Sequence, residues 1–345
     1  LATAWGKVLL ERTDMSLKTD TLYLNRLKSK AYYNTFGTIL DEQTKLTSER
    51  GIYFMDLKKY RFISDVKIND PEYQIKSQQL DYFTESDKAF FYGKTSIIGD
   101  EYDIYCEKGS YDTKLQKGSF QKNAIIFYNN KEIRGDSLYF ENERDYAAAT
   151  NNISIIDTLN KSVINGHYGE IFKSRDSAII TRRAMAINIV DKDSLFIHAD
   201  TLIATGPQEK RILRGYYDVR IFKSDLRGKS DSLHLNQSSG LIKMLKLPLS
   251  RKENRIFTES QKNARNPILW FGKSQMSGNK IFLTSNMKNQ KLDSLKIIGN
   301  SWIIEKDSLS ETGFNQIKGG LLDGLFEDGE LVEIDITKNT EVIYY

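Results

Sequence analysis

The side chains that could carry catalytic chemistry are few in this sequence. It contains three histidines, His167, His198 and His234, which lie far apart and share no spacing typical of a zinc site. No Gly-x-Ser-x-Gly elbow marks a nucleophilic serine, and the glycine patterns that bind phosphate groups are also missing. We therefore expect no metal site, no cofactor and no enzymatic activity.

Four aspartates recur in one setting and form the strongest candidate for acid–base chemistry. Each precedes a leucine by two residues, and they are Asp20, Asp136, Asp200 and Asp231. Paired carboxylates of this kind could hydrolyse glycosides, as they do on carbohydrate-active β-helices. Catalytic pairs interrupt a repeat, however, whereas these acids follow it. We interpret them as turn residues that bond to their own backbone at the start of each strand.

Cysteine content and charge exclude further classes of site. The single cysteine, Cys106, cannot form an internal disulfide and lies in an alternating run, so we expect it to be a small apolar strand residue. The 50 Lys and Arg against 46 Asp and Glu give a net charge of only +4. Basic pairs such as Arg182–Arg183 are scattered among acids, which does not favour nucleic-acid binding.

These residues are positioned by a repeated strand, whose clearest copy is the segment 135–142. It reads Gly-Asp-Ser-Leu-Tyr-Phe-Glu-Asn, with apolar residues at alternate positions, and looser copies occur along the chain. A period of about 30 residues indicates stacked repeats. The anchor residues that show this period are Leu22, Ile52, Leu80, Tyr111, Leu138, Ile171, Leu202 and Leu233.

Each repeat divides into two strands, because a second alternating run such as 60–69 or 215–222 follows each anchor. Helical spacing is not sustained anywhere, so the fold class is all-β. Two strands per repeat predict a folded-over sheet with two facing walls. We expect regular repeats over 1–236 and a less regular continuation over 237–345, with a loop or insertion near 238–266.

The alternation leaves open whether the walls close on a core or keep an apolar groove, since both need the same residues. In segment 135–142 we expect Asp136 and Asn142 to set the turns, Leu138 and Phe140 to face inward, and Tyr139 to face outward. The candidates for the inner surface are Leu22, Leu24, Ile52, Phe54, Leu80, Tyr82, Leu138, Phe140, Leu202, Leu233 and Leu235. Uncovered strands at the ends of such an array would be either an aggregation hazard or a docking surface for another sheet.

The repeated pattern resembles the OstA-like family, the organic-solvent-tolerance and lipopolysaccharide transport A proteins of the bacterial envelope. The resemblance rests on the anchors Ala199-Asp200-Thr201-Leu202 and 135–140, on intervening strands such as 64–68 and 298–304, and on the closing pattern 331–345. It covers most of the chain, least clearly between about 238 and 266. The chain is much longer than a minimal family member.

The resemblance implies an elongated, open β-jellyroll with a V-shaped sheet, whose apolar groove shields the lipid A acyl chains of lipopolysaccharide. It also implies a periplasmic location, edge-strand joining with other jellyroll proteins of the transport machinery, and contact with an outer-membrane translocon. Two other classes stay open: a structural or adhesive β-solenoid with a sealed core and no lipid, and, less favoured, a polysaccharide-acting β-helix enzyme.

Overall fold

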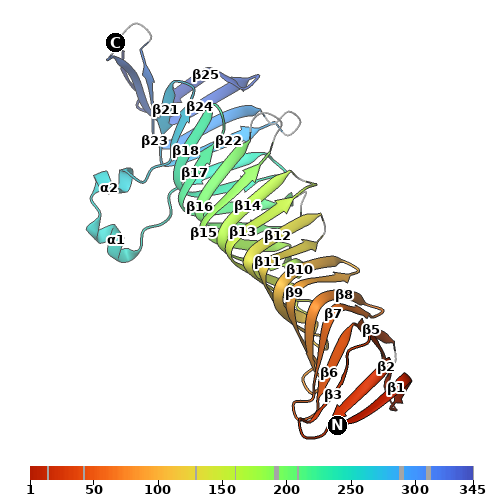
Figure 1. Ribbon diagram of the computed structural model, residues 1–345. Helices are drawn as coiled ribbons and strands as arrows, with labels where there is room; N and C mark the ends of the chain where they lie inside the picture. The colour runs from red at the N-terminus through yellow and green to blue at the C-terminus, as the bar shows by residue number, and fades with distance from the viewer. Residues whose placement is uncertain are drawn as a thin grey trace. The chain divides into compact units, whose positions relative to one another are not determined.

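A computed structural model describes residues 1–13, 15–41, 43–128, 130–159, 161–189, 194–207, 210–286, 291–307 and 312–344. The chain divides into two compact units, residues 1–159 and 160–345, which are treated one at a time below. Both are built almost entirely of antiparallel strands that follow one another side by side (Figure 1). The all-β prediction is confirmed.

Unit 1 is a stack of strands joined by short turns, each strand pairing mainly with its neighbours in sequence. The strands are β1 (Ala2–Glu11), β2 (Met15–Asn25), β3 (Lys30–Tyr33), β4 (Gly37–Asp41), β5 (Thr44–Ser48), β6 (Arg50–Phe54), β7 (Lys59–Asn69), β8 (Tyr73–Phe83), β9 (Lys88–Gly99), β10 (Tyr102–Asp112), β11 (Lys117–Tyr128), β12 (Lys131–Glu141) and β13 (Tyr146–Asp157).

Unit 2 repeats the plan and adds a helical excursion. Its strands are β14 (Ser162–Phe172), β15 (Ser177–Asn188), β16 (Leu195–Thr205), β17 (Ile212–Phe222), β18 (Leu226–Asn236), β19 (Leu241–Leu245), β20 (Ile268–Phe271), β21 (Ser274–Ser277), β22 (Lys280–Ser285), β23 (Leu292–Lys306), β24 (Phe314–Glu327), β25 (Glu330–Thr337) and β26 (Glu341–Ile343). The helices are η1 (Lys173–Arg175), α1 (Arg251–Ile256) and α2 (Glu259–Asn263).

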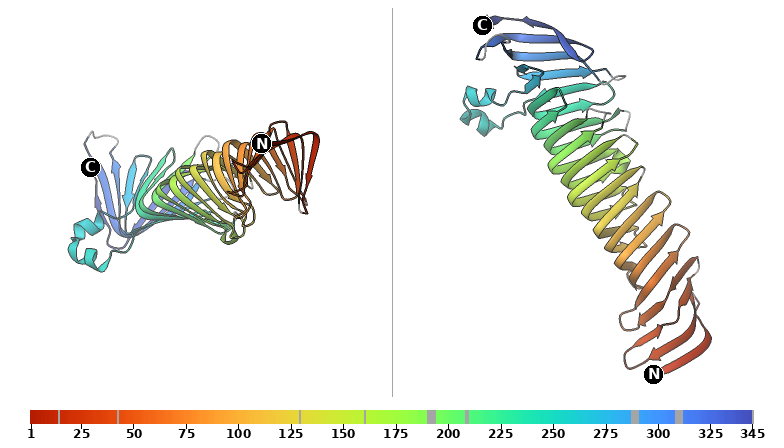
Figure 2. Two further views of the ribbon diagram at one scale, coloured as in Figure 1. Left: turned by 60° about the horizontal axis from the view of Figure 1, so that its bottom comes forward. Right: turned by 45° about the horizontal axis from the view of Figure 1, so that its top comes forward.

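A bulge at the middle of alternate strands bends each unit into two walls, visible in the turned views of Figure 2. In β11 the pairing with β12 jumps from Gln121–Ser137 to Ala124–Gly135, so Lys122 and Asn123 lie opposite Asp136 alone. Both bulged residues have positive φ, 58° and 54°. A two-against-one bulge bends a strand and increases its twist. The two halves of each strand therefore belong to different walls.

We call the residue opposite each bulge the corner residue. The corner positions of successive bent strands are Asp20, Glu49, Gln78, Glu107, Asp136, His167, Asp200 and Asp231, spaced 29 to 33 residues apart. The predicted period of about 30 residues is thus the distance between corners. The half-strands before the corner residues form the first wall, and those after them form the second wall.

The predicted role of Asp136 as a turn residue at a strand start is wrong, because β12 runs through it from Lys131 to Glu141. Its carboxylate instead accepts hydrogen bonds of 3.1 Å from Asn152 Nδ2, which lies in the next bulge. Glu107 accepts a similar bond from Asn123. Asn142 does lie in the turn after β12. Asp136 and Glu107 thus stabilise the corners at which they lie.

The helical excursion of unit 2 is an insertion at one corner. β19 and β20 pair with the two halves of β18, so together they form one bent strand, which residues 246–267 interrupt. At its base Arg265 forms an ion pair with Asp231, and the backbone N–H of Leu247 donates to the same carboxylate. Capping boxes at Ser250 and Thr258 begin α1 and α2.

Candidate functional site

The inner face of the first wall in unit 1 carries an unbroken ladder of isoleucine and leucine. Residues paired directly across neighbouring strands share a face, so the pairing register traces each row through the sheet. Ile75, Ile97 and Ile104 are at most 2% exposed. In order, the ladder consists of Leu17, Ile39, Leu46, Ile68, Ile75, Ile97, Ile104, Ile126, Ile133 and Ile155.

The second wall of unit 1 carries two inner rows in which glycine and alanine are interspersed among large residues. The row next to the corner is Tyr33, Gly51, Phe62, Leu80, Phe91, Gly109, Phe120, Leu138 and Ala149. The row nearer the mouth, the open ends of the two walls, is Leu24, Ala31, Tyr53, Tyr60, Tyr82, Ala89, Tyr111, Gly118, Phe140 and Ala147.

The two walls of unit 1 touch each other through aromatic side chains at the mouth. Tyr73 and Tyr111 are in edge contact at 6.3 Å between ring centroids, and Tyr102 packs on Phe140 at 5.0 Å. Burial raises the pKa of Tyr111 above its usual range, and the ring is 1% exposed. Between β8 and β12, therefore, the inner face is a packed core and not an open channel.

Cys106 lies inside this core, at the inner corner of β10. It is 1% exposed, and burial raises the pKa of its thiol to about 12. A buried thiol with a raised pKa is unreactive, because the thiolate is the nucleophile. Cys106 therefore occupies the place of a small apolar strand residue, as the sequence predicts.

The inner face of β14–β17 in unit 2 differs, since glycine and alanine replace the aromatic residues. Ile171, Ala178 and Ala204 in the mouth row are half-buried, as are Ile164 and Ala186 on the first wall. No aromatic residue faces inward from these four strands. The small residues of this stretch are Gly166, Gly169, Ala178, Ala184, Ala186, Ala199, Ala204 and Gly215.

Nine of the eleven residues predicted for the inner surface lie on the inner face of their own unit. Leu80, Leu138, Leu202 and Leu233 are at most 1% exposed and belong to the sealed corner rows. The remaining five inner residues are half-buried and lie nearer the mouth or the unit 1 edge: Leu22, Leu24, Tyr82, Phe140 and Leu235.

The inward orientation predicted for Ile52 and Phe54 is wrong. In β6 the inner positions belong to Gly51 and Tyr53, which pair with Phe62 and Tyr60. The corner before β6 falls at Glu49 and shifts the alternation by one residue compared with the other anchors. A slip of one residue exchanges the two faces of a strand.

Ile52 and Phe54 lie beside a charged cluster on the outer face, because they pair with Arg61 and Lys59. Arg61 donates two hydrogen bonds of 2.7 Å to Asp81, and Lys59 Nζ lies 3.0 Å from the same carboxylate. Lys59 also lies over the Phe54 ring at 5.1 Å. Burial alone would raise the pKa of Asp81, but the hydrogen bonds from Arg61 and Lys59 outweigh it and lower that pKa. This cluster stabilises the wall from outside.

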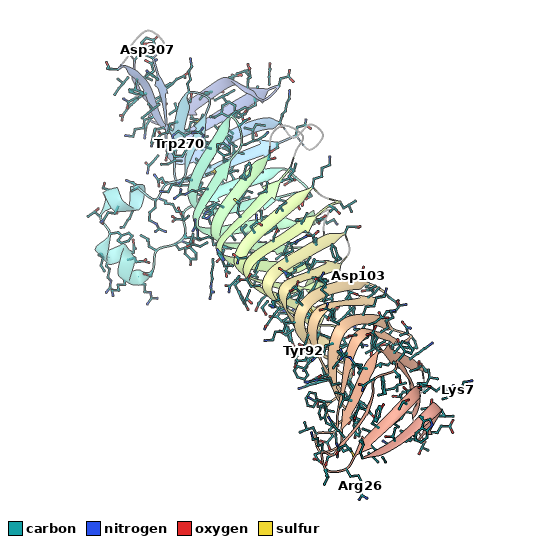
Figure 3. All side chains as sticks on the ribbon, in the orientation of Figure 1. Lys7, Arg26, Tyr92, Asp103, Trp270 and Asp307 are labelled. Atoms are coloured by element: carbon teal, nitrogen blue, oxygen red, sulfur yellow. The ribbon has the colours of Figure 1, made fainter. Side chains whose placement is uncertain are left out.

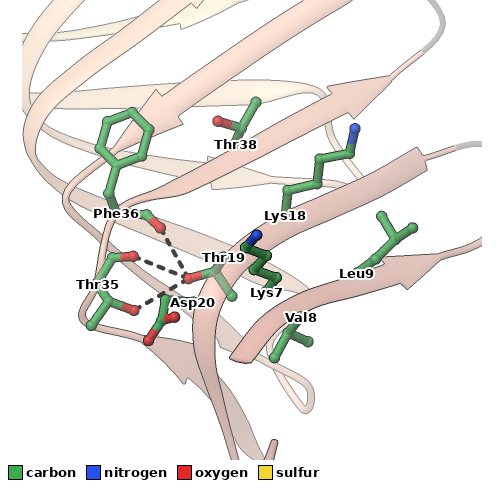
Figure 4. A pocket seen from close by; sticks show the side chains of 9 residues that line it. All are labelled: Lys7, Val8, Leu9, Lys18, Thr19, Asp20, Thr35, Phe36 and Thr38. Atoms are coloured by element: carbon green, nitrogen blue, oxygen red, sulfur yellow. Dashed lines mark hydrogen bonds between the residues drawn. The ribbon is translucent and has the colours of Figure 1, made fainter. Parts of the chain in front are cut away.

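A separate open hollow of about 500 Å³ lies at the corner of β1, β2 and β4 (Figure 4). Lys7 and Lys18 border it, and Thr19 Oγ1 donates to the Phe36 carbonyl at 2.9 Å on its floor. Lys18 and Thr38 point outward from the first wall, so the hollow is not part of the inner face. Polar and charged side chains cover much of the outer surface, as Asp103 shows on β10 (Figure 3).

Both units present an exposed apolar edge strand. In β1, Trp5 is 77% and Leu9 51% exposed, and in the described residues this strand pairs with β2 alone. In unit 2, Val332 of β25 is 52% exposed and Val342 of β26 is 61% exposed. Tyr345, the last residue of the predicted closing pattern, lies outside the described residues. Unpaired edges of this kind accept further strands.

The isoleucine ladder was missed by sequence reasoning, although a spacing signal for it exists. Ile75, Ile104 and Ile133 each lie three residues before a corner residue. The first inner position of the second wall lies two residues after the corner, at Leu80 or Leu138 for example. The last inner residue before the corner and the first one after it are therefore five residues apart. In a straight strand this odd spacing would place them on opposite faces, so the alternation of one half-strand does not predict the inner residues of the other.

Residues 1–78 match the sequence model of the OstA-like protein family, which confirms the predicted family resemblance over this part of the chain. A search of curated proteins found no match to the chain. Among the described residues, no helix is long and apolar enough to cross a membrane. That part of the chain also contains no group of three or more His, Cys, Asp or Glu side chains placed to hold a metal ion.

Proposed function

We propose that this protein, whose residues 1–78 match the OstA-like family, binds lipopolysaccharide without changing it chemically and passes it along a periplasmic bridge to the outer membrane. The acyl chains lie against half-buried inner residues near the mouth, such as Leu213 and Leu235. Neighbouring jellyroll proteins join the exposed edge strands, and an outer-membrane translocon receives the lipid. The observation that supports this proposal best is the continuity of the inner rows, which place apolar side chains on strand after strand.

The energetics of acyl-chain burial favour such a surface. Each methylene group removed from water contributes about 0.8 kcal/mol, so a chain of twelve carbons gains about 9 kcal/mol when fully covered. The inner rows near the mouth are half-buried at Leu213 and Leu235 and can receive such a chain. Arg175 and Lys210, in the turns that end the second wall, can form charge-assisted hydrogen bonds with lipid phosphates.

A second candidate function is supported by the closed stretch of unit 1. The contacts of Tyr73 with Tyr111 and of Tyr102 with Phe140 fill the space between the walls there. A structural β-solenoid, with a core throughout and no ligand, would need the same packing. Binding of lipid by the intact chain distinguishes the two functions.

The test compares two neighbouring residues of β18 that point to opposite faces. Leu235 faces inward and His234 outward, and both are half-buried. Purified chain is mixed with rough-type lipopolysaccharide, and the complex is measured by native mass spectrometry. We expect L235D to weaken binding at least tenfold and H234D to change it less than twofold, with similar melting temperatures. No complex with the unsubstituted chain would favour the solenoid.

A further inference from the structure

The insertion at the corner of unit 2, residues 246–267, carries the net positive charge of the chain. It contains six basic residues and two acidic ones, and the chain as a whole has a net charge of +4. The six basic residues are Lys246, Arg251, Lys252, Arg255, Lys262 and Arg265. Basic and acidic residues balance outside the insertion, so the charge that attracts an anionic partner is concentrated in this one short segment.

The three cations of α1 have no anionic partner within the chain. Arg251, Lys252 and Arg255 are exposed, and no carboxylate in the described part of the chain forms an ion pair with them. The acid of the same helix, Glu253, is engaged in the capping box, where its Oε2 accepts a hydrogen bond of 2.9 Å from the backbone N–H of Ser250. The positive charge of α1 is therefore available to a partner.

The same side of α1 exposes an apolar side chain. Ile256 is 63% exposed. Because successive residues of an α-helix are about 100° apart, the three cations and Ile256 fall within an arc of about 140°, and Glu253 lies outside it. Neither α1 nor α2 has a buried residue, and both lie beside the strands of unit 2 in Figures 1 and 2. The helices thus add little to the core and present this surface to solvent.

The size of the insertion favours a lipid surface over a protein as the partner. α1 and α2 contain six and five residues, so each is at most about 9 Å long and about 10–12 Å wide. A standard protein interface covers about 800 Å² on each partner, which is several times what these helices present. An anionic lipid surface sets no such minimum. Each Lys or Arg near it strengthens binding about fivefold, and an apolar side chain can enter the boundary between headgroups and acyl chains.

We propose that the insertion of unit 2 docks on the surface of an anionic lipid bilayer. Arg251, Lys252 and Arg255 contact the lipid phosphates through charge-assisted hydrogen bonds, and Ile256 lies between the headgroups. The contact holds unit 2 beside a membrane through a segment that takes no part in the inner face. It goes beyond the proposed function, because it requires no lipopolysaccharide and no inner residue.

The test compares two pairs of cations of unit 2 in the full chain. R251Q/K252Q removes two cations of α1, and R182Q/R183Q removes two exposed cations from the bulge of β15. Each chain is sedimented at low salt with vesicles of equimolar phosphatidylcholine and phosphatidylglycerol, and with vesicles of phosphatidylcholine alone. We expect the unsubstituted chain to bind the anionic vesicles at least tenfold more tightly. R251Q/K252Q should weaken that binding about 25-fold and R182Q/R183Q less than threefold.

A second pair of variants tests the insertion of the apolar side chain. I256Q and V342Q each replace an exposed apolar residue of unit 2, since Ile256 is 63% and Val342 61% exposed. I256Q should weaken binding to the anionic vesicles about fivefold, because part of an isoleucine side chain no longer leaves water. V342Q should change it less than twofold, and both variants should keep the melting temperature of the unsubstituted chain.

Three outcomes would overturn the assignment. The first is an unsubstituted chain that does not bind the anionic vesicles. The second is equal weakening by the two pairs of cation substitutions. The third is weakening by R251Q/K252Q with no effect of I256Q, which would indicate a purely ionic contact of the kind that an acidic protein makes. Lipopolysaccharide is absent from the vesicles, so none of these results decides the proposed function.

Discussion

Replacing Phe120, next to the corner of unit 1, by alanine should expose Cys106, the single cysteine of the chain. Phe120 is 0% exposed on the inner face of β11, where it pairs with Gly109 and Leu138. A Cβ atom on Gly109 would lie 3.1 Å from the Phe120 ring and 3.2 Å from Cys106 Sγ. The ring and the thiol therefore flank the same glycine, and F120A creates a cavity beside Cys106.

The expected magnitude follows from the burial of both groups. Replacing a core Phe by Ala costs about 3–5 kcal/mol, which raises the population of opened molecules about 100- to 4,000-fold. In the folded chain the pKa of Cys106 is raised to about 12. At pH 8 about one thiol in 10,000 is then ionised, compared with about a quarter for a free cysteine of pKa about 8.5. Reaction thus proceeds through opening.

The assay is the rate of reaction of the full chain with excess 5,5′-dithiobis(2-nitrobenzoic acid) at pH 8. We expect very slow reaction in the unsubstituted chain and an increase of at least 100-fold in F120A. Phe127 lies on the same strand but is 44% exposed, so F127A is the matched control and should change the rate less than threefold. A fast-reacting unsubstituted chain, or equal effects of F120A and F127A, would refute the sealed corner.

Three further substitutions test the outer charged cluster, the inner row of the second wall and the corner insertion. D81N should destabilise unit 1 by about 2 kcal/mol at pH 7 in urea unfolding, because Arg61 loses its buried carboxylate partner. The folded pKa of Asp81 is lowered, so its contribution is complete above about pH 4, the pKa of an unfolded aspartate, and is lost as the pH falls below that value. G118A should cost about 1–3 kcal/mol in the same measurement, because its Cβ would lie 2.8 Å from the Ser110 carbonyl oxygen. R265A should release the base of the corner insertion, and trypsin should then cleave residues 251–262 several-fold faster, with the fold retained.

Asp103 is exposed on the outer face, so D103N should leave unfolding unchanged, and equal effects of D103N and D81N would contradict the cluster's role. A Cβ atom on Gly118 would also lie 2.6 Å from the Phe120 ring. A G118A chain as stable as the original would show that this ring and the Ser110 carbonyl can both move aside. Unchanged trypsin cleavage in R265A would mean that the ion pair does not hold the insertion.

The OstA-like resemblance of residues 1–78 and the all-β class could be predicted from sequence, because both depend on local patterns. Alternation of apolar residues is set by the geometry of a strand, and the 30-residue period is set by two bent strands and their turns. Anchor residues such as Leu138 and Leu233 were placed on the inner face by alternation alone. The helical excursion was located only as an insertion, since α1 and α2 are too short to show a helical period.

Pairing between strands decided the rest. The inner positions Ile133 and Leu138 are five residues apart, which a straight strand would place on opposite faces. The bulge of β11 against Asp136 turns both inward, and no residue of β12 alone reveals it. The same shift at Glu49 moves Ile52 and Phe54 to the outer face.

The sequence by itself determined that apolar side chains would line a folded-over sheet with a repeat of about 30 residues, because that follows from alternation and period. Only the tertiary structure decided where the space between the walls is filled. Tyr111 meets Tyr73 across unit 1, whereas no aromatic residue faces inward from β14–β17 of unit 2. Filling depends on which side chains face each other from opposite walls, and bulges and register set those partners.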